Sequence, residues 1–393
     1  MKKLAFISIL CLCFILLVSC NSADEPIDIF TDESRPLPSP EEQIASCDHH
    51  LGEWKTVGAD NCITEGVKTR KCKFCPYEES ESVFGEHSFV SGKCEFCDRR
   101  APSEGFRFEK DNSNNGYIAF ITKDVTDEIV SFPDEHLGKP ITRIDTQSDS
   151  VLENVREIYI PASVVYIESG AFAHMTNLSA VHIEEESKLT RISTGAFRDC
   201  TSLVSVSFEN CTRLNSIGGG VFKGCSKLKK IEFADTVKEI GNGTFADCVS
   251  LENINFMNKF TVISDSMFAG CTGLKNIRIP DSVTEIQDYA FSDSGLEHVA
   301  LPQSLETIGK YAFRDCESLQ IVEFNGSISA ISEGMFYGCV SLMEVSGNVV
   351  IFRIEKNAFV NCAKLTTLGL RISYEVYVGE NAFAGCDSLE NIP

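Results

Sequence analysis

The chain has 393 residues and a formal net charge of −22 at pH 7, with 18 cysteines and 27 phenylalanines. It contains no basic run and no patch in which lysines or arginines alternate with aromatic residues. This balance argues against nucleic acid as a partner and against attraction to anionic lipid headgroups.

Residues 1–20 have the pattern of a secretion signal, because two lysines precede an apolar run at residues 4–18 that is too short to span a bilayer. Leu17-Val18-Ser19-Cys20 resembles a bacterial lipobox, which implies cleavage before Cys20 and lipid attachment to it. An ordinary signal peptide with a chance cysteine is the alternative. The acidic, proline-rich residues 21–46 favour lipidation, since they are typical of a tether leaving a membrane. We expect an extracytoplasmic bacterial lipoprotein at the cell surface, attached to the membrane only by its lipid.

Residues 47–100 form a separate Cys-rich segment that is too small for a hydrophobic core of its own, so a metal or disulfides should stabilise it. Two C-x-x-C pairs with 18 residues between them match the spacing of a four-cysteine zinc site. The predicted ligands are Cys72, Cys75, Cys94 and Cys97, and the further candidates are Cys47, His49, His50, Cys62 and His87. The segment resembles zinc-ribbon-like modules that are appended to bacterial surface repeat proteins.

Disulfides are the alternative for these cysteines, because exported cysteines often oxidise. Paired C-x-x-C spacing with nearby histidines favours zinc. A shell of four protein ligands leaves no open coordination position, so the expected role of the zinc is structural.

Residues 101–148 lack the repeat described below but contain short apolar alternations, at Phe106/Phe108 and Tyr117/Ala119/Ile121, around the turn-forming residues 112–116. We expect strands of a β cap that covers the first coil of the following domain.

Residues 149–393 repeat one phrase at a period of 22 to 25 residues: an Ala-Phe or near equivalent, a cysteine three residues later and a leucine six residues later. Apolar pairs such as Val206/Phe208 follow with a period of two, which predicts one half-buried strand per repeat. No single coil can bury these faces, so the coils must stack into a solenoid. The marker residues are Phe172, Phe197, Phe222, Phe245, Phe268, Phe291, Phe313, Phe336, Phe359 and Phe383.

The repeat closely resembles the leucine-rich repeat of the bacterial surface family called BspA-like, most clearly at Ile277-Arg278-Ile279-Pro280-Asp281-Ser282-Val283-Thr284-Glu285-Ile286. The resemblance covers about residues 150 to 393 and implies a mainly β, right-handed solenoid of about ten repeats. BspA-like proteins are implicated in adhesion to host matrix or plasma proteins and in contacts between bacterial cells. The resemblance therefore implies a protein partner on a host or a neighbouring bacterial cell.

The cysteines that follow eight of the ten repeat Phe residues are interpreted as small buried packing groups that make weak hydrogen bonds to turn carbonyls, and a redox or metal ladder is the rejected alternative. Met175 and Ser294 take this position in the first and sixth repeats. Cys211 lies outside this column and has no explanation from sequence. Gly218-Gly219-Gly220 is assigned to a turn that needs positive φ, because no Lys followed by Ser or Thr completes a phosphate-binding loop. No capping segment follows the last repeat, so we expect that end to fray, to self-associate or to continue into further chain.

No catalytic motif is present, so we predict a protein that is not an enzyme. The leading hypothesis is an adhesin-like lipoprotein that binds a protein through the outward positions of its strands. The alternatives are a metal-handling envelope lipoprotein, in which residues 47–97 hold exchangeable zinc, and an enzyme that acts on envelope polymers. The outward positions are mixed and mostly polar: His182, Ser207, Glu232, Asn255, Arg278, Ala300, Glu323, Ser346 and Gly369.

Overall fold

The computed structural model of the chain describes residues 51–57, 65–73, 77–84, 89–90, 93–94, 100–146, 152–254 and 260–390. It divides into two compact units, Met1–Glu86 and His87–Pro393. Every regular element in these ranges is a β-strand, and none of the described segments forms a helix long and apolar enough to cross a membrane. The predicted signal peptide with Cys20 and the predicted linker at residues 21–46 lie outside the described residues.

The first unit contains one antiparallel three-stranded sheet, in the order β1–β2–β3. Its strands are β1 (Lys55–Val57), β2 (Glu65–Lys71) and β3 (Glu78–Phe84). On β2, the Lys68 ammonium and the Arg70 guanidinium lie 4.9 and 4.6 Å from the centre of the Trp54 ring. Arg70 also pairs with Glu79 across the β2–β3 ladder at 2.7 Å. These contacts form a polar cluster on the small sheet.

The second unit starts with short strands that lead into a stack of coils. They are β4 (Phe89–Val90), β5 (Lys93–Cys94), β6 (Phe106–Asp111), β7 (Gly116–Ile121), β8 (Ile129–Ser131), β9 (Glu135–His136) and β10 (Lys139–Thr146). β6 and β7 form an antiparallel hairpin at the segments where the sequence alternates, and β7 then pairs in parallel with β10. The hairpin thereby extends one of the two sheets of the solenoid.

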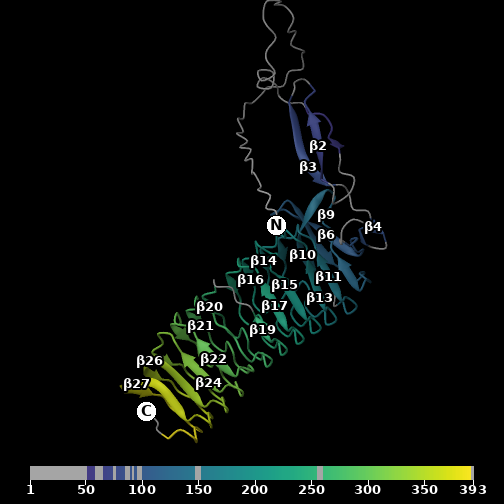
Figure 1. Ribbon diagram of the computed structural model, residues 1–393. Coiled ribbons are helices and arrows are strands. Elements are labelled where there is room, and N and C mark those ends of the chain that lie inside the picture. The colour runs from purple at the N-terminus through teal and green to yellow at the C-terminus, as the bar shows by residue number, and fades with distance from the viewer. Residues whose placement is uncertain are drawn as a thin grey trace, which may run out of the picture. The chain divides into compact units, whose positions relative to one another are not determined.

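Most turns of the solenoid contribute one strand to a front sheet and one to a back sheet (Figure 1), whereas the coil at Asn276 contributes only an isolated bridge to the front. The front strands form two ladders. The first contains β8, β11 (Glu157–Ile160), β13 (Ala180–Ile183), β15 (Ser205–Phe208), β17 (Lys230–Phe233) and β19 (Asn253–Ile254), and the second starts after the coil at Asn276 with β22 (His298–Leu301) and β24 (Ile321–Phe324). The back sheet follows β10 with β12 (Tyr166–Ile167), β14 (Arg191–Ile192), β16 (Ser216–Ile217), β18 (Glu239–Ile240), β20 (Val262–Ile263), β21 (Glu285–Ile286), β23 (Thr307–Ile308) and β25 (Ala330–Ile331).

Two long strands, β26 (Glu344–Ile354) and β27 (Thr367–Val378), run from the front sheet into the back sheet without a break. Pairing along the solenoid is parallel and one repeat apart. For example, Val206 lies opposite Ile231 and Phe208 opposite Phe233. Identical positions of successive repeats therefore form columns.

The core is a column of stacked phenylalanine rings. The ten repeat phenylalanines are buried, and the centroids of successive rings lie 5.0 to 5.8 Å apart with interplanar angles of 1 to 24°. The repeat leucines pack beside them, and all except Leu389 are fully buried. The predicted solenoid of stacked repeats is confirmed, and its core consists of interfaces between neighbouring coils.

The backbone turns sharply on both sides of each repeat Phe. The residues two positions before and two positions after it have positive φ, for example Gly220 at 61° and Gly224 at 75° around Phe222. The Gly218–Gly220 segment therefore belongs to a turn, as predicted. Gly218 is needed for a different reason, since a Cβ there would come within 2.6 Å of the Thr194 backbone nitrogen.

Candidate binding surface

The column of repeat cysteines is a structural element of the core. Each Sγ donates a hydrogen bond of 3.0–3.1 Å to the carbonyl oxygen of the Phe one repeat earlier. Burial raises the pKa of Cys225 and of Cys271 to about 12. Because the thiolate is the nucleophile and the metal ligand, burial keeps Cys225 and Cys271 in the unreactive thiol form at neutral pH. The structural interpretation is confirmed for Cys200, Cys225, Cys248, Cys271, Cys316, Cys339, Cys362 and Cys386.

Cys211 has a related packing role at another corner of the coil. Its carbonyl oxygen accepts a 2.9 Å hydrogen bond from the Leu214 backbone nitrogen, in the same kind of turn that Pro280 and Val283 make in a later repeat at 3.1 Å. The side chain is fully buried. Burial raises the pKa of Cys211 to about 11, although a hydrogen bond with Ser187 opposes the rise. Cys211 thus replaces a proline at this corner.

Side chains on the outer face of the front sheet do not pack in the core. On β15, Ser205 and Ser207 are exposed while Val206 and Phe208 are buried, and the same alternation recurs on β22 and β24. The predicted outward positions are exposed or half-buried at His182, Ser207, Glu232, Arg278, Ala300, Glu323, Ser346 and Gly369, and Asn255 lies outside the described residues. These side chains are therefore available for recognition.

The most distinctive part of this face is a groove at its N-terminal end, which sequence reasoning missed. The groove has a volume of about 730 Å³, and its lining includes Arg100, Tyr159 and His182. The Tyr159 and His182 rings stack with centroids 4.2 Å apart and an interplanar angle of 18°. The Arg100 guanidinium carbon lies 5.2 Å from the centre of the Tyr159 ring, within cation–π range.

One carboxylate contacts both of these rings. Glu157 Oε2 accepts a hydrogen bond from Tyr159 Oη at 3.3 Å and lies 3.3 Å from His182 Nε2. Tyr159 precedes the first repeat phenylalanine, but it lies directly opposite His182 in the β11–β13 ladder. The alternation of Ile158 and Ile160 around Tyr159 is the signal that could have placed it on the outer face.

A second groove, of about 570 Å³, opens farther along the same sheet and is polar. Its lining includes Lys229, Glu252, Asn253, Lys275 and Asn276. Lys229 Nζ lies 3.6 Å from Glu252 Oε1. Because lysines and a glutamate both line this groove, it favours a polar partner of mixed charge over a strongly charged polymer.

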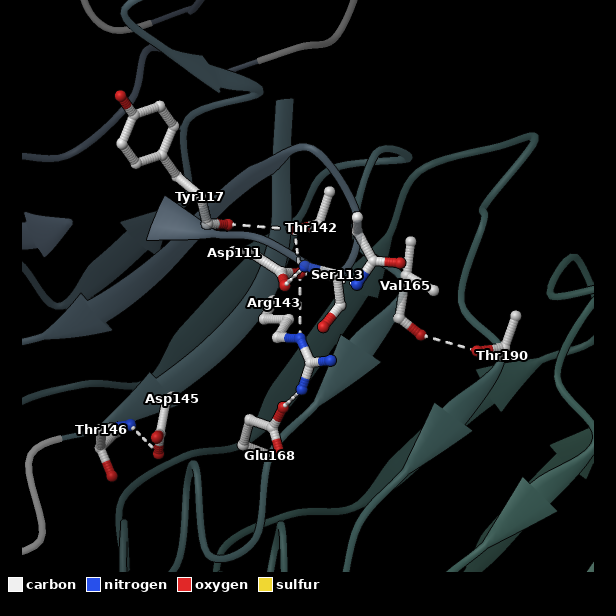
Figure 2. A network of polar contacts seen from close by, with 11 residues as sticks. Asp111, Ser113, Tyr117, Thr142, Arg143, Asp145, Thr146, Val165, Glu168 and Thr190 are labelled. Atoms are coloured by element: carbon white, nitrogen blue, oxygen red, sulfur yellow. Dashed lines mark hydrogen bonds and ion pairs between the residues drawn. The ribbon is translucent and has the colours of Figure 1, made fainter. Parts of the chain in front are cut away.

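A polar network joins the β6–β7 hairpin to the first coils (Figure 2). Asp111 Oδ2 accepts hydrogen bonds from Thr142 Oγ1 at 2.8 Å and from Arg143 Nε at 3.0 Å. Arg143 Nη1 reaches Glu168 Oε1 at 2.6 Å in the next coil, and its guanidinium lies 4.6 Å from the centre of the Tyr166 ring. The guanidinium therefore bridges a carboxylate of the hairpin and a carboxylate of the coil after β10.

Asp111 is held in its ionised form. Burial alone would raise its pKa, but hydrogen bonds from the side chains of Asn114, Thr142 and Arg143 and from the Ser113 backbone N–H outweigh burial and lower the pKa to about 2. With its carboxylate oxygens engaged by these donors, Asp111 is suited to stabilising the hairpin and not to proton transfer.

Of the predicted zinc ligands, only Cys72 has a described side chain. It is buried, and its backbone forms an isolated bridge to Leu51. For Cys94 only the backbone is described, at the end of β5. Zinc binding stays a prediction, because the other predicted ligands lie outside the described residues. These are Cys75, Cys97, Cys47, His49, His50, Cys62 and His87. Among described residues, no three His, Cys, Asp or Glu side chains cluster as metal ligands would.

Stacked coils with one apolar-in, polar-out strand per repeat define a leucine-rich repeat solenoid. The model of the BspA type leucine rich repeat region matches in overlapping segments, at residues 142–275, 190–319, 238–366 and 284–393, which together cover more than half of the chain. The chain belongs to this family. No curated protein matches it.

Several solved structures of bacterial proteins match the chain. A leucine-rich repeat protein from Bacteroides ovatus is 23% identical over 74% of this chain and 81% of its own, with a TM-score of 0.56. The T. pallidum leucine-rich repeat protein is 25% identical over 56% of this chain and 91% of its own, with a TM-score of 0.44. The pneumococcal vaccine antigen PcpA is 16% identical over 83% and 98%, with a TM-score of 0.43.

Proposed function

We propose that this protein is a non-enzymatic, adhesin-like surface lipoprotein that binds a protein partner through the outer face of its front sheet. The proposal rests on the difference between the inward and the outward side chains of each repeat. The inward side chains are used to build the Phe, Leu and Cys columns, whereas the outward side chains of the front strands are exposed and contribute nothing to the core. Such a face is an extended, regular binding surface of the kind that repeat proteins use.

The groove beside Arg100, Tyr159 and His182 supplies the anchor for such a partner. Tyrosine and arginine are enriched among the residues that contribute most to protein interfaces, because they combine large contact area with hydrogen-bonding ends. Here both lie against one another beside a half-buried carboxylate, Glu157. These residues suit a polar segment of a partner protein that inserts one apolar or aromatic side chain into the groove.

The front sheet is also large enough for stable recognition. Parallel strands lie about 4.8 Å apart, so the eight front strands from β8 to β24, with the coil at Asn276 between β19 and β22, span on the order of 40 Å. A four-residue strand is about 13 Å long, so a standard interface of about 800 Å² on each partner would extend over the whole front face and onto the turns beside it. Lipid attachment at Cys20 and the tether at residues 21–46 would hold this face away from the membrane, and family membership supports a surface location.

The test is binding of the unlipidated mature chain, residues 21–393, to a panel of immobilised matrix and plasma proteins. The test variant carries Tyr159→Ser and His182→Ser. A matched control carries Arg191→Ser and Glu239→Ser, which change two exposed residues of the back sheet. We expect saturable binding that weakens at least about tenfold in the front variant and is unchanged in the control.

Equal loss in both variants, or no binding by a folded chain to any protein of the panel, would overturn the proposal. The second result would shift attention to the Cys-rich segment and to the alternative of metal handling. In that case zinc should exchange readily with a mild chelator, whereas a structural site should resist it.

A further inference from the structure

The back sheet of the solenoid is interrupted at two steps. β18 does not pair with β20, and β23 does not pair with β25, although each pair of strands lies on successive coils whose back strands are described. At the other steps, the residue that follows the back strand donates its backbone N–H to an Ile carbonyl oxygen of the coil before, as Gly241 does to Ile217 at 2.9 Å. At the interrupted steps this residue is Ser264 or Ser332, and its N–H has no backbone acceptor among the described residues.

A serine hydroxyl takes the place of the missing N–H at both steps. Ser264 Oγ lies 3.0 Å from the carbonyl oxygens of both Ile240 and Gly241. Ser332 Oγ donates a hydrogen bond to the carbonyl oxygen of Ile308. Because a hydroxyl rotates to suit its partners, whereas a ladder N–H is fixed in the backbone, these bonds hold the back strands of neighbouring coils less tightly than a β-ladder does.

A buried methionine distinguishes the interrupted coils from the others. The residue directly before the repeat Phe is Met267 in one of them and Met335 in the other, both fully buried, whereas it is Ala, Val or Thr in the remaining coils. Serine alone does not interrupt the sheet, since Ser193 donates its N–H to Ile167 at 2.9 Å in a coil that has Ala196 at this position. In a close-packed interior the longer methionine side chain leaves less room for the back strand to close on its neighbour.

The coil that contains Met267 is also interrupted on its front side. Its front strand β19 pairs with β17 of the coil before, but no ladder joins β19 to the described residues of the next coil. Glu252 donates its N–H to Lys229 at 3.1 Å, and Glu297 donates to Lys275 at 2.9 Å, whereas Lys275 and Glu252 share no such bond. The polar groove of about 570 Å³ lies at this step, because its lining comes from both of the coils that fail to pair.

The edge of the solenoid that carries the repeat phenylalanines stays continuous through this coil. Phe245 donates its N–H to the Met267 carbonyl oxygen at 3.0 Å, and Phe268 donates to that of Ala290 at 2.8 Å. The ring centroids of Phe245, Phe268 and Phe291 follow one another at 5.5 and 5.4 Å. Each of the two steps beside the Met267 coil therefore keeps this edge and one sheet, and lacks the other sheet.

We propose that the coil of β19 and β20 is a joint at which the solenoid bends. Bending opens the back of the solenoid at one step and the front at the next, with the column of repeat phenylalanines as the shared pivot. Segments with few backbone hydrogen bonds to their neighbours open at low energetic cost, and small movements at such a point redirect the rigid elements on either side. The joint adjusts the curvature of the front face and the width of the polar groove. It is a property of the repeat stack, whether or not the front face binds a partner.

Residual dipolar couplings of the backbone N–H groups measure this bending directly. They are recorded on the perdeuterated, unlipidated chain, residues 21–393, and fitted separately for residues 152–241 and 282–324, which lie on either side of the joint. Motion at the joint averages the alignment of one segment relative to the other, so the two segments of the wild type should give alignment tensors of different magnitude. In Met267→Ala, where the smaller side chain lets the back ladder close, one tensor should fit both segments.

Hydrogen exchange tests whether the methionine is the cause. In Met267→Ala the Ser264 amide should gain its backbone acceptor and exchange at least about tenfold more slowly than in the wild type. Met335→Ala should slow the Ser332 amide in the same way, which provides an independent test if one variant fails to fold. Met267→Leu, which conserves side-chain volume, and Met175→Ala, which removes a buried methionine of the first repeat, are the controls and should leave the Ser264 amide unchanged.

Far-UV circular dichroism establishes that each variant is folded. A single alignment tensor that fits both segments of the wild type would overturn the proposal, and so would a wild-type difference that Met267→Ala leaves unchanged. Ser264 and Ser332 amides that exchange at the wild-type rate in folded Met267→Ala and Met335→Ala would do the same.

Discussion

Replacing Asp111 with asparagine should destabilise the β6–β7 hairpin in a pH-dependent way. The pKa of Asp111 is lowered from an ordinary value of 3.8 to about 2. At about 1.4 kcal/mol for each pKa unit, the ionised carboxylate contributes about 2 kcal/mol. Because the folded-state pKa is the lower one, this contribution is present above pH 4 and is lost as the pH falls from about 4 to about 2. The asparagine side chain would keep the shape but not the charge, and Arg143 would keep Glu168 as a partner.

The assay is urea denaturation of the wild type and of Asp111→Asn at several pH values, combined with hydrogen exchange of the β6 and β7 amides to detect local opening. At pH 7 the variant should be less stable by about 2 kcal/mol, and the difference should close as the pH falls toward 2. Asp281→Asn removes an exposed carboxylate and is the matched control. A difference between wild type and Asp111→Asn that is absent at pH 7, or that persists unchanged at pH 2, would refute the reasoning.

Three further outcomes are expected. Phe245→Ala removes a buried ring stacked between Phe222 and Phe268, and should lower the free energy of unfolding by about 3–5 kcal/mol in chemical denaturation; a loss below that of an exposed substitution would contradict the stacked core. The repeat cysteine Cys271 should react with a thiol reagent only after denaturation, since burial raises the pKa of Cys271 to about 12; rapid labelling of Cys271 itself in the native chain, located by peptide mass spectrometry, would contradict the structural role. The mature chain should contain zinc by elemental analysis and lose it in Cys72→Ser, whereas a metal-free chain with oxidised cysteines would favour disulfides.

The repeat core could be predicted because one residue type recurs at one position in every coil. The Phe, Leu and Cys columns follow from the period alone, and so does the outward set from His182 to Gly369. Parallel stacking in register then turns each sequence position into a column. Even the weak thiol hydrogen bonds were predictable, since one repeat has a serine, Ser294, at the position of the cysteine. Ser294 Oγ lies 3.3 Å from Cys316 Sγ.

Two features that sequence reasoning missed occur where the repeat pattern breaks. Tyr159 lies in a coil before the first repeat Phe, so no periodic marker placed it, and its contact with Arg100 joins segments that are far apart in the chain. The long strand β26 replaces the proline-containing corner seen at Pro280 with the β-branched run Val349-Val350-Ile351, which favours an extended backbone. The positive φ on the far side of each Phe is also occupied by several residue types, including Asp199 and Gly224, so it leaves no single-letter signal.

The most direct test of the central claim is a side-chain footprint of the bound state, once a partner has been captured. Hydroxyl-radical labelling of residues 21–393, alone and in complex, compares the exposure of individual side chains. Binding through the front sheet predicts protection of Tyr159, His182 and their front-sheet neighbours, with Arg191 on the back sheet unchanged. Protection confined to the back sheet or to residues 51–84, with the front sheet labelled as in the free chain, would contradict the account.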